Sequence, residues 1–94
     1  MDDKANNIDS KVAKVKLVSD AEPLKGKTLT KKLLLSMQVS ALKALCAKLF
    51  KVEIICQVLA YKEEGDEKEY DFDVDHRQLS FYGVKEGGTI IVRS

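Results

Sequence analysis

The feature that most constrains the fold of this chain is a change of hydrophobic period near residue 38. Before it, "KVAKVKLVS" at 11–19 alternates apolar residues with lysines, a pattern typical of a half-buried strand. After turn signals, "KTLTKKLLL" at 27–35 predicts a second strand. In "QVSALKALCAKLFKV" at 38–52 the apolar residues instead recur every three or four positions, which predicts an amphipathic helix of about three turns.

Shorter patterns follow this helix. "CQVLAYKEEGDEKEY" predicts a third strand that runs into an acidic loop, and "EYDFDVD" alternates again, with Tyr70, Phe72 and Val74 on one side. "HRQLSFYGV" suggests a short turn of helix, and "TIIVRS" predicts a last strand with Ile90 and Val92 inward. Two strands, a helix and two or three further strands predict an α+β fold in which a sheet grasps one main helix.

Two details within these elements stay open. Lys31 interrupts the apolar face between Leu29 and Leu33, so either a bulge or a snorkelling lysine is expected there. The helix has no glycine after it, so its C-terminal end is not sharply defined. Lys48 and Lys51 near that end suit the negative pole of the helix dipole.

The length of 94 residues predicts one domain. Residues 1–10 are polar and are expected to be a disordered leader, with the domain covering 11–94. No uninterrupted apolar run is longer than four residues, which is too short to span a membrane. Two cysteines are too few for a disulfide framework, so a cytoplasmic setting is expected. The chain is also expected to be a monomer in isolation.

The net charge of +1 conceals an asymmetry. Residues 1–51 hold eleven lysines against five acidic residues, a net +6, whereas residues 52–94 hold five basic against ten acidic residues, a net −5. This division indicates either a dipole that steers charged partners or two ordinary solvated faces. Nucleic acid is not an expected partner, because the pI is 7.7 and the basic half has no aromatic residue before Phe50.

No catalytic, cofactor or metal site is expected. Cys46 lies on the apolar stripe of the helix, and nothing marks His76 as a base for it or for Cys56. Asp71, Asp73 and Asp75 have the spacing of the first calcium ligands of an EF-hand, but the glycine and glutamate that such a loop requires later are missing. The alternation there is better explained by a strand edge.

Three stretches carry a resemblance: "KKLLLSMQVSALKALCAKLFKV", "VEIICQVLAY" and "LSFYGVKEGGTIIVRS". Together, over about residues 28–94, they resemble the C-terminal ubiquitin-like domain of the tubulin-folding cofactor E family and its E-like relatives. The resemblance implies a β-grasp fold, a mixed sheet of four to five strands packed on one main helix. The glycine-rich cytoskeleton-associated domain and the leucine-rich repeats of that family do not occur here, so the chain is expected to be one piece of a longer protein.

The resemblance also implies a function. It points to a non-conjugating protein-interaction domain that supports α-tubulin folding and αβ-tubulin heterodimer assembly or disassembly in the cytoplasm, associated with the cytoskeleton. The implied partners are α-tubulin, other tubulin cofactors and the proteasome. Matching to the receptor patch of ubiquitin places Ala60, Ile91 and Arg93 at the patch positions, of which only Ile91 is a large apolar anchor.

The basic half offers a second candidate surface. Lys25, Lys27, Lys31 and Lys32 in the first hairpin suit an acidic protein surface, and the acidic tails of tubulin are our hypothesis for it. Two rival functions stay open. A generic β-grasp signalling adaptor would show GTP-dependent binding through the lysines of the second strand, and a ubiquitin-like modifier would be processed and conjugated.

The modifier hypothesis depends on Gly87-Gly88. A modifier carries its diglycine on a flexible tail beyond the last strand, whereas here the pair precedes that strand and Arg93-Ser94 ends the sequence. Cleavage after Gly88 would remove inward-facing residues. The two glycines are therefore predicted to form a tight turn that needs positive φ.

Overall fold

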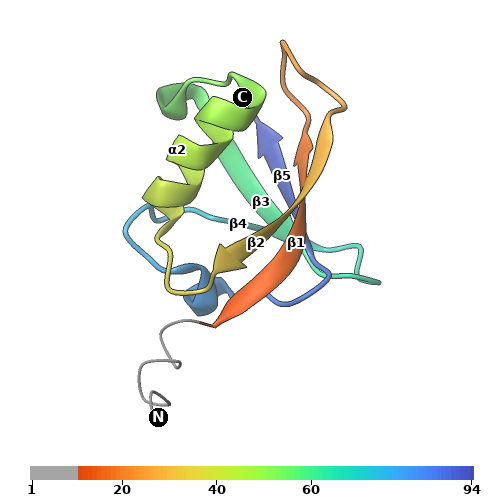
Figure 1. Ribbon diagram of the computed structural model, residues 1–94, viewed down its shortest axis with the longest axis vertical. Helices are drawn as coiled ribbons and strands as arrows, with labels where there is room; N and C mark the ends of the chain where they lie inside the picture. Colours follow the sequence, from red (N-terminus) through yellow and green to blue (C-terminus); the bar gives the residue numbers. More distant parts are fainter. Residues whose placement is uncertain (1–10) are drawn as a thin grey trace.

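A five-stranded mixed sheet curls around one helix in the computed structural model, which describes residues 11–94 (Figure 1). The leader predicted for 1–10 lies outside the described residues. In chain order the elements are β1 Val12–Ser19, β2 Thr28–Leu34, α2 Val39–Phe50, the 3₁₀ helix η1 Ile54–Cys56, β3 Val58–Lys62, β4 Glu69–Asp71, the 3₁₀ helix η2 Leu79–Tyr82 and β5 Thr89–Arg93.

The sheet order is β2-β1-β5-β3-β4. The central pair, β1 and β5, is parallel, and every other neighbouring pair is antiparallel. This arrangement confirms the predicted α+β fold, a β-grasp with one main helix. Because β5 inserts between β1 and β3, the first and last strands of the described residues lie side by side at the centre of the sheet.

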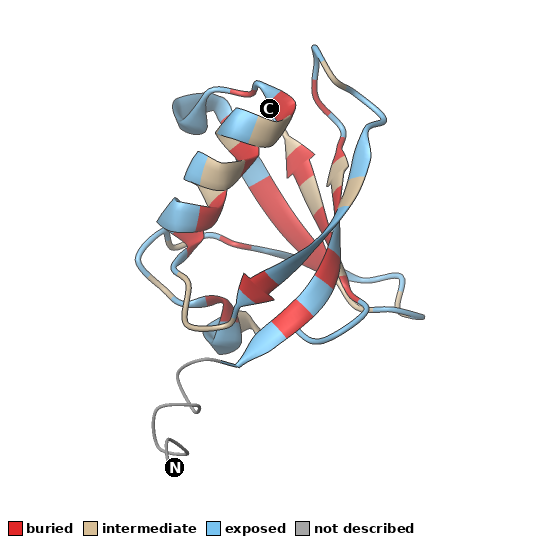
Figure 2. Ribbon diagram, viewed as in Figure 1, coloured by how far each residue is buried: buried red, intermediate tan, exposed pale blue. Residues whose placement is uncertain are grey.

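The core lies between the inner face of the sheet and α2, and Figure 2 shows the buried residues in red on both of these elements. The inward residues of β1 are 2% exposed or less. On α2 the buried stripe consists of Val39, Leu42, Cys46 and Phe50, all at 0% exposure. The amphipathic period predicted for the helix is thus confirmed, and Ile90 and Val92 point inward as expected.

The ends of α2 are held by backbone groups. At the N-terminus, the free N–H groups of Val39 and Ser40 donate to the carbonyls of Arg77 and Asp75, both at 2.9 Å. At the C-terminus, Lys51 takes a left-handed conformation with φ +62° and its N–H donates to the carbonyl of Ala47. A lysine therefore ends the helix where no glycine is present.

Two strand predictions required refinement. The β1–β2 register runs without interruption past Lys31, which lies opposite Val15 on the inner face, so there is no bulge and the lysine side chain is exposed at the sheet margin. The strand predicted over 69–75 was too long, because β4 ends at Asp71. Beyond Asp71 the strand does not continue, because the Val74 N–H donates to the Tyr82 hydroxyl and not to a neighbouring strand.

None of the helices in the described part, 11–94, has the length and apolar character needed to cross a membrane.

Candidate interaction surface

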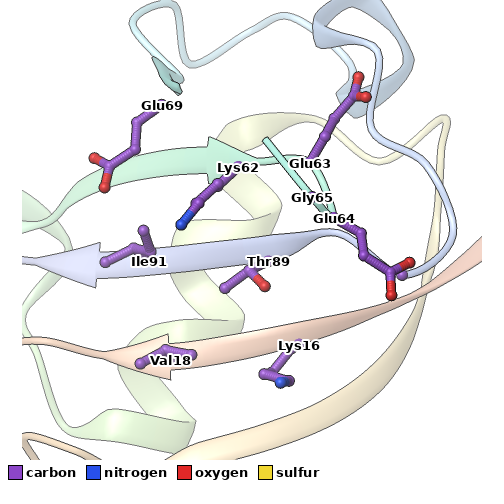
Figure 3. A pocket seen from close by; sticks show the side chains of 10 residues that line it. Lys16, Val18, Lys62, Glu63, Glu64, Gly65, Glu69, Thr89 and Ile91 are labelled. Carbon is purple, nitrogen blue, oxygen red and sulfur yellow. The ribbon is translucent and has the colours of Figure 1, made fainter. Parts of the chain in front are cut away.

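The sheet face turned away from α2, called here the outer face, carries an open hollow of about 440 Å³ (Figure 3). Its floor is formed by Val18 of β1 and Ile91 of β5, which are register partners in the parallel pair. Both side chains are half-buried. Because β1 and β5 lie side by side, two apolar residues 73 positions apart in the sequence form one apolar strip.

Charged side chains surround this strip. Lys62, Thr89 and Lys16 form the next row across β3, β5 and β1. Three acidic side chains also line the hollow: Glu69 of β4, and Glu63 and Glu64 of the loop after β3. Figure 3 shows Glu64 extending toward the start of β5. An apolar floor with a basic and an acidic rim suits contact with the side chains of another protein, whose apolar anchor would be flanked by charges of either sign.

Ala60, Ile91 and Arg93, the residues matched to the ubiquitin patch, lie together on the outer face but differ in how much surface they offer a partner. Ile91 is directly opposite Ala60 on β3. Ala60 is 0% exposed, so it supports the surface from beneath and offers a partner no area of its own. Arg93 follows two residues after Ile91 on the same face of β5 and is half-exposed.

Arg93 is held by two carboxylates. Its Nη1 and Nη2 donate to Oε1 and Oε2 of Glu69 at 2.9 and 3.2 Å, a bidentate pair, and its Nε donates to Asp20 Oδ2 at 3.4 Å. The hydrogen bonds from Arg93 hold the pKa of the Glu69 carboxyl below its ordinary value, and the same contact raises the pKa of Arg93. Arg93 thus joins the ends of β5, β4 and β1 and fixes one margin of the surface.

The four candidate lysines are not part of this hollow. Lys25 and Lys27 lie in the β1–β2 connection, and Lys31 and Lys32 lie on β2, two strands away from Ile91 in the sheet order. Lys31 lies on the inner face and Lys32 on the outer face. All four are exposed, but they surround an edge strand and do not form one flat patch.

The sequence prediction missed Val18, Lys16, Lys62 and Thr89 as members of the surface. The alternation of the first strand already placed Lys16 and Val18 on its outer side. Their proximity to Ile91 depends on the parallel β1–β5 pairing, which no local pattern reveals.

The diglycine is a turn, as predicted. Gly87 has φ +88°, and its N–H donates to the Lys14 carbonyl at 2.9 Å. The carbonyl of Gly88 accepts from the Lys16 N–H at 2.9 Å. The pair is therefore bonded to β1 immediately before β5 begins, which leaves no flexible diglycine at this position. Of the two, only Gly87 has the positive φ that favours glycine.

The cysteines occupy two different environments. Cys46 is 0% exposed, and burial raises the pKa of its thiol to about 12, so it stays protonated and unreactive in the folded protein. Cys56 is exposed on η1. Within 11–94, no three His, Cys, Asp or Glu side chains lie close enough together to hold a metal ion.

Comparison with known proteins agrees with this geometry. A family model described as a ubiquitin-like domain matches residues 13–93. The fold is similar to the C-terminal ubiquitin-like domain of mouse tubulin-specific chaperone E, with a TM-score of 0.75, 28% identity, and coverage of 89% of this chain and 87% of that one. A comparison with curated protein sequences gave no significant match.

Two further solved structures share the fold at lower identity. Tubulin-binding cofactor B of Trypanosoma brucei has a TM-score of 0.77 at 20% identity, with coverage of 89% of this chain and 95% of that one. The ubiquitin of Caldiarchaeum subterraneum has a TM-score of 0.64 at 19% identity, with coverage of 89% and 94%.

Proposed function

The chain belongs to the ubiquitin-like domain family, and from that premise we propose that it is a non-conjugating protein-interaction domain of a tubulin-cofactor protein. In this role it supports α-tubulin folding and the assembly or disassembly of the αβ heterodimer, in the cytoplasm and in association with the cytoskeleton. The observation that carries the proposal is the 28% identity with the mouse chaperone E domain over 87% of that domain.

The chemistry of the outer face supports a binding role. Ubiquitin-like domains are generally non-enzymatic interaction modules, and the hollow here is a shallow apolar strip between charged rims. In our proposal Ile91 and Val18 receive an apolar side chain of the partner. Arg93 is held by Glu69, so it contributes a fixed margin and does not have to be ordered on binding, which lowers the entropic penalty of association.

Binding of the whole chain to purified αβ-tubulin and to purified tubulin cofactors, measured by calorimetry, tests this proposal. We expect saturable binding to at least one of them, weakened at least about tenfold by Ile91→Asp, because a carboxylate in the apolar floor loses its hydration when a partner covers it. Ile55→Asp is the matched control, since Ile55 is 90% exposed on η1.

Two outcomes would refute the proposal. One is the absence of binding to tubulin and to all the cofactors. The other is equal binding by Ile91→Asp and the parent chain when circular dichroism shows both to be folded, which would move the contact away from the outer face.

A further inference from the structure

One edge of the sheet has backbone groups with no hydrogen-bond partner among residues 11–94. β2 is the outermost strand on its side and is seven residues long. The Leu35 N–H donates to the Lys11 carbonyl, and the Ser19 N–H donates to the Lys27 carbonyl, which fixes the alternation of the β1–β2 ladder. Because bonded and non-bonded pairs alternate in an antiparallel ladder, the odd-numbered residues of β2 bond to β1. The even-numbered residues direct their N–H and C=O groups away from it.

The outward-directed groups belong to Thr28, Thr30, Lys32 and Leu34. Of their eight backbone atoms, only the Leu34 carbonyl accepts a backbone hydrogen bond from elsewhere in 11–94, from the Met37 N–H. β2 is also exposed along most of its length, as Figure 2 shows. A row of free donors and acceptors at this spacing matches the backbone of one more extended strand.

Positive charge lies on both sides of this edge. Lys32 on the outer face is directly opposite Lys14 on β1, so two like charges are neighbours across the ladder, an arrangement that is unfavourable in the free protein. Lys31 extends from the inner face of the same strand. Among residues 11–94, none of these three ammonium groups has a carboxylate within ion-pair distance.

The opposite edge of the sheet, formed by β4, differs from the β2 edge in the length of its strand and in the sign of its charge. β4 has only three residues, and two of them are the acidic Glu69 and Asp71. A very short edge strand provides too few backbone groups to hold an added strand. The sheet therefore has one long basic edge and one short acidic edge, and only the long edge offers both backbone pairing and charge complementarity to an acidic partner.

We propose that the β2 edge binds an extended acidic segment of another protein, which adds to the sheet as a sixth strand. The backbone of that segment pairs with the even-numbered residues from 28 to 34. Its acidic side chains neutralise Lys14 and Lys32 on the outer face and Lys31 on the inner face. The inference rests on the proposed function only in taking the chain to be a protein-binding module, and it does not require that the partner be tubulin.

Amide hydrogen exchange, followed by NMR, tests the inference directly. The probe is the synthetic peptide Glu-Glu-Val-Glu-Glu-Val-Glu with blocked ends, which has glutamates on both faces of an extended strand, added to the full chain at low salt. We expect exchange to slow at least about tenfold at Thr28, Thr30 and Lys32, whose N–H groups become bonded. Leu29 and Lys31 are internal controls, because their N–H groups already bond to β1. The same peptide with lysine in place of glutamate should not bind.

Substitutions in β2 distinguish the contribution of lysine charge to peptide binding from the contribution of backbone hydrogen bonds. The double change Lys31→Glu with Lys32→Glu should abolish peptide binding, whereas Lys48→Glu, an exposed lysine on α2, should leave it unchanged. Thr30→Pro removes one outward donor without removing a β1–β2 hydrogen bond, so it should weaken binding while the chain stays folded.

Several outcomes would overturn the inference. Peptide binding without slowed exchange at the even-numbered amides would mean contact through side chains alone. If the double lysine variant self-associates and still binds the peptide, the lysines serve only to keep copies of the chain apart. If the chain binds neither tubulin nor any cofactor but the peptide slows exchange, the proposed function fails and this inference stands. If the chain binds one of them but the peptide does not slow exchange, this inference fails and the proposed function stands.

Discussion

The ring of Tyr61 lies directly over Gly88. A β-carbon added at residue 88 would be 2.5 Å from both Cε1 and the hydroxyl oxygen of Tyr61, and 2.8 Å from its Cζ. The Tyr61 side chain is 1% exposed, and its hydroxyl accepts a hydrogen bond from the Lys85 N–H at 2.9 Å. The second glycine of the pair is therefore explained by close packing against a fixed aromatic ring.

Replacing Gly88 with alanine should destabilise the domain by about 3 kcal/mol, the upper end of what overpacking costs, because the buried and hydrogen-bonded ring cannot move away. Gly65→Ala is the control. Gly65 has a positive φ, which Gly88 does not, and a β-carbon there meets nothing within 4 Å, so a loss of about 1 kcal/mol from backbone strain alone is expected. Urea unfolding measures both, and equal losses would contradict the importance of the Tyr61 contact.

Cutting the chain after Gly88 should unfold it, in contrast to the processing of a modifier. The lost segment contains Ile90 and Val92, both at 0% exposure, and all of β5, which pairs with β1 and β3 at the centre of the sheet. Circular dichroism of a chain ending at residue 88 should show loss of the cooperative thermal transition, whereas removal of Ser94 alone should leave it intact. A folded chain of 88 residues would contradict this prediction.

Elements that depend on neighbouring residues could be predicted from the sequence, whereas elements that depend on contacts with more distant residues could not. β1 and α2 were predictable because their apolar periods are local and strong. The end of β4 at Asp71 was not predictable, because it depends on the Tyr82 hydroxyl, which takes the Val74 N–H that a longer strand would have used. A local alternation pattern contains no information about such a competing partner.

The candidate surface was predictable only in part, for a related reason. Ile91 and Arg93 were correctly placed on one face of β5, but the burial of Ala60 depends on neighbours from two adjacent strands. The split of Lys31 and Lys32 between opposite faces does follow from the period of two along a strand.

The Arg93–Glu69 contact predicts a pH dependence. The pKa of Glu69 is lowered in the folded state by the hydrogen bonds from Arg93, so the contact contributes stability above the ordinary carboxyl value of 4.5. That contribution is lost as the pH falls through the lowered value. The stability difference between the parent chain and Arg93→Gln should therefore be present at pH 7 and vanish in acid.

NMR titration of the Glu69 carboxyl carbon checks the same contact directly. Its pKa should be below 4.5 in the parent chain and should return towards 4.5 in Arg93→Gln. Asp20→Ala is the control: it removes the 3.4 Å contact to Arg93 Nε but leaves the bidentate pair intact, so the Glu69 pKa should stay low. An unchanged Glu69 pKa in Arg93→Gln would mean that the pair does not persist in solution.

The two cysteines should differ sharply in reactivity. Alkylation proceeds through the thiolate, and burial raises the pKa of Cys46 to about 12, whereas Cys56 is exposed. Iodoacetamide at pH 8 should therefore add one group to the folded chain, at Cys56, and a second only in urea. Mass spectrometry of Cys56→Ser should show no adduct under native conditions. Rapid native labelling of Cys46 would mean that α2 detaches from the sheet far more often than its fully buried stripe implies.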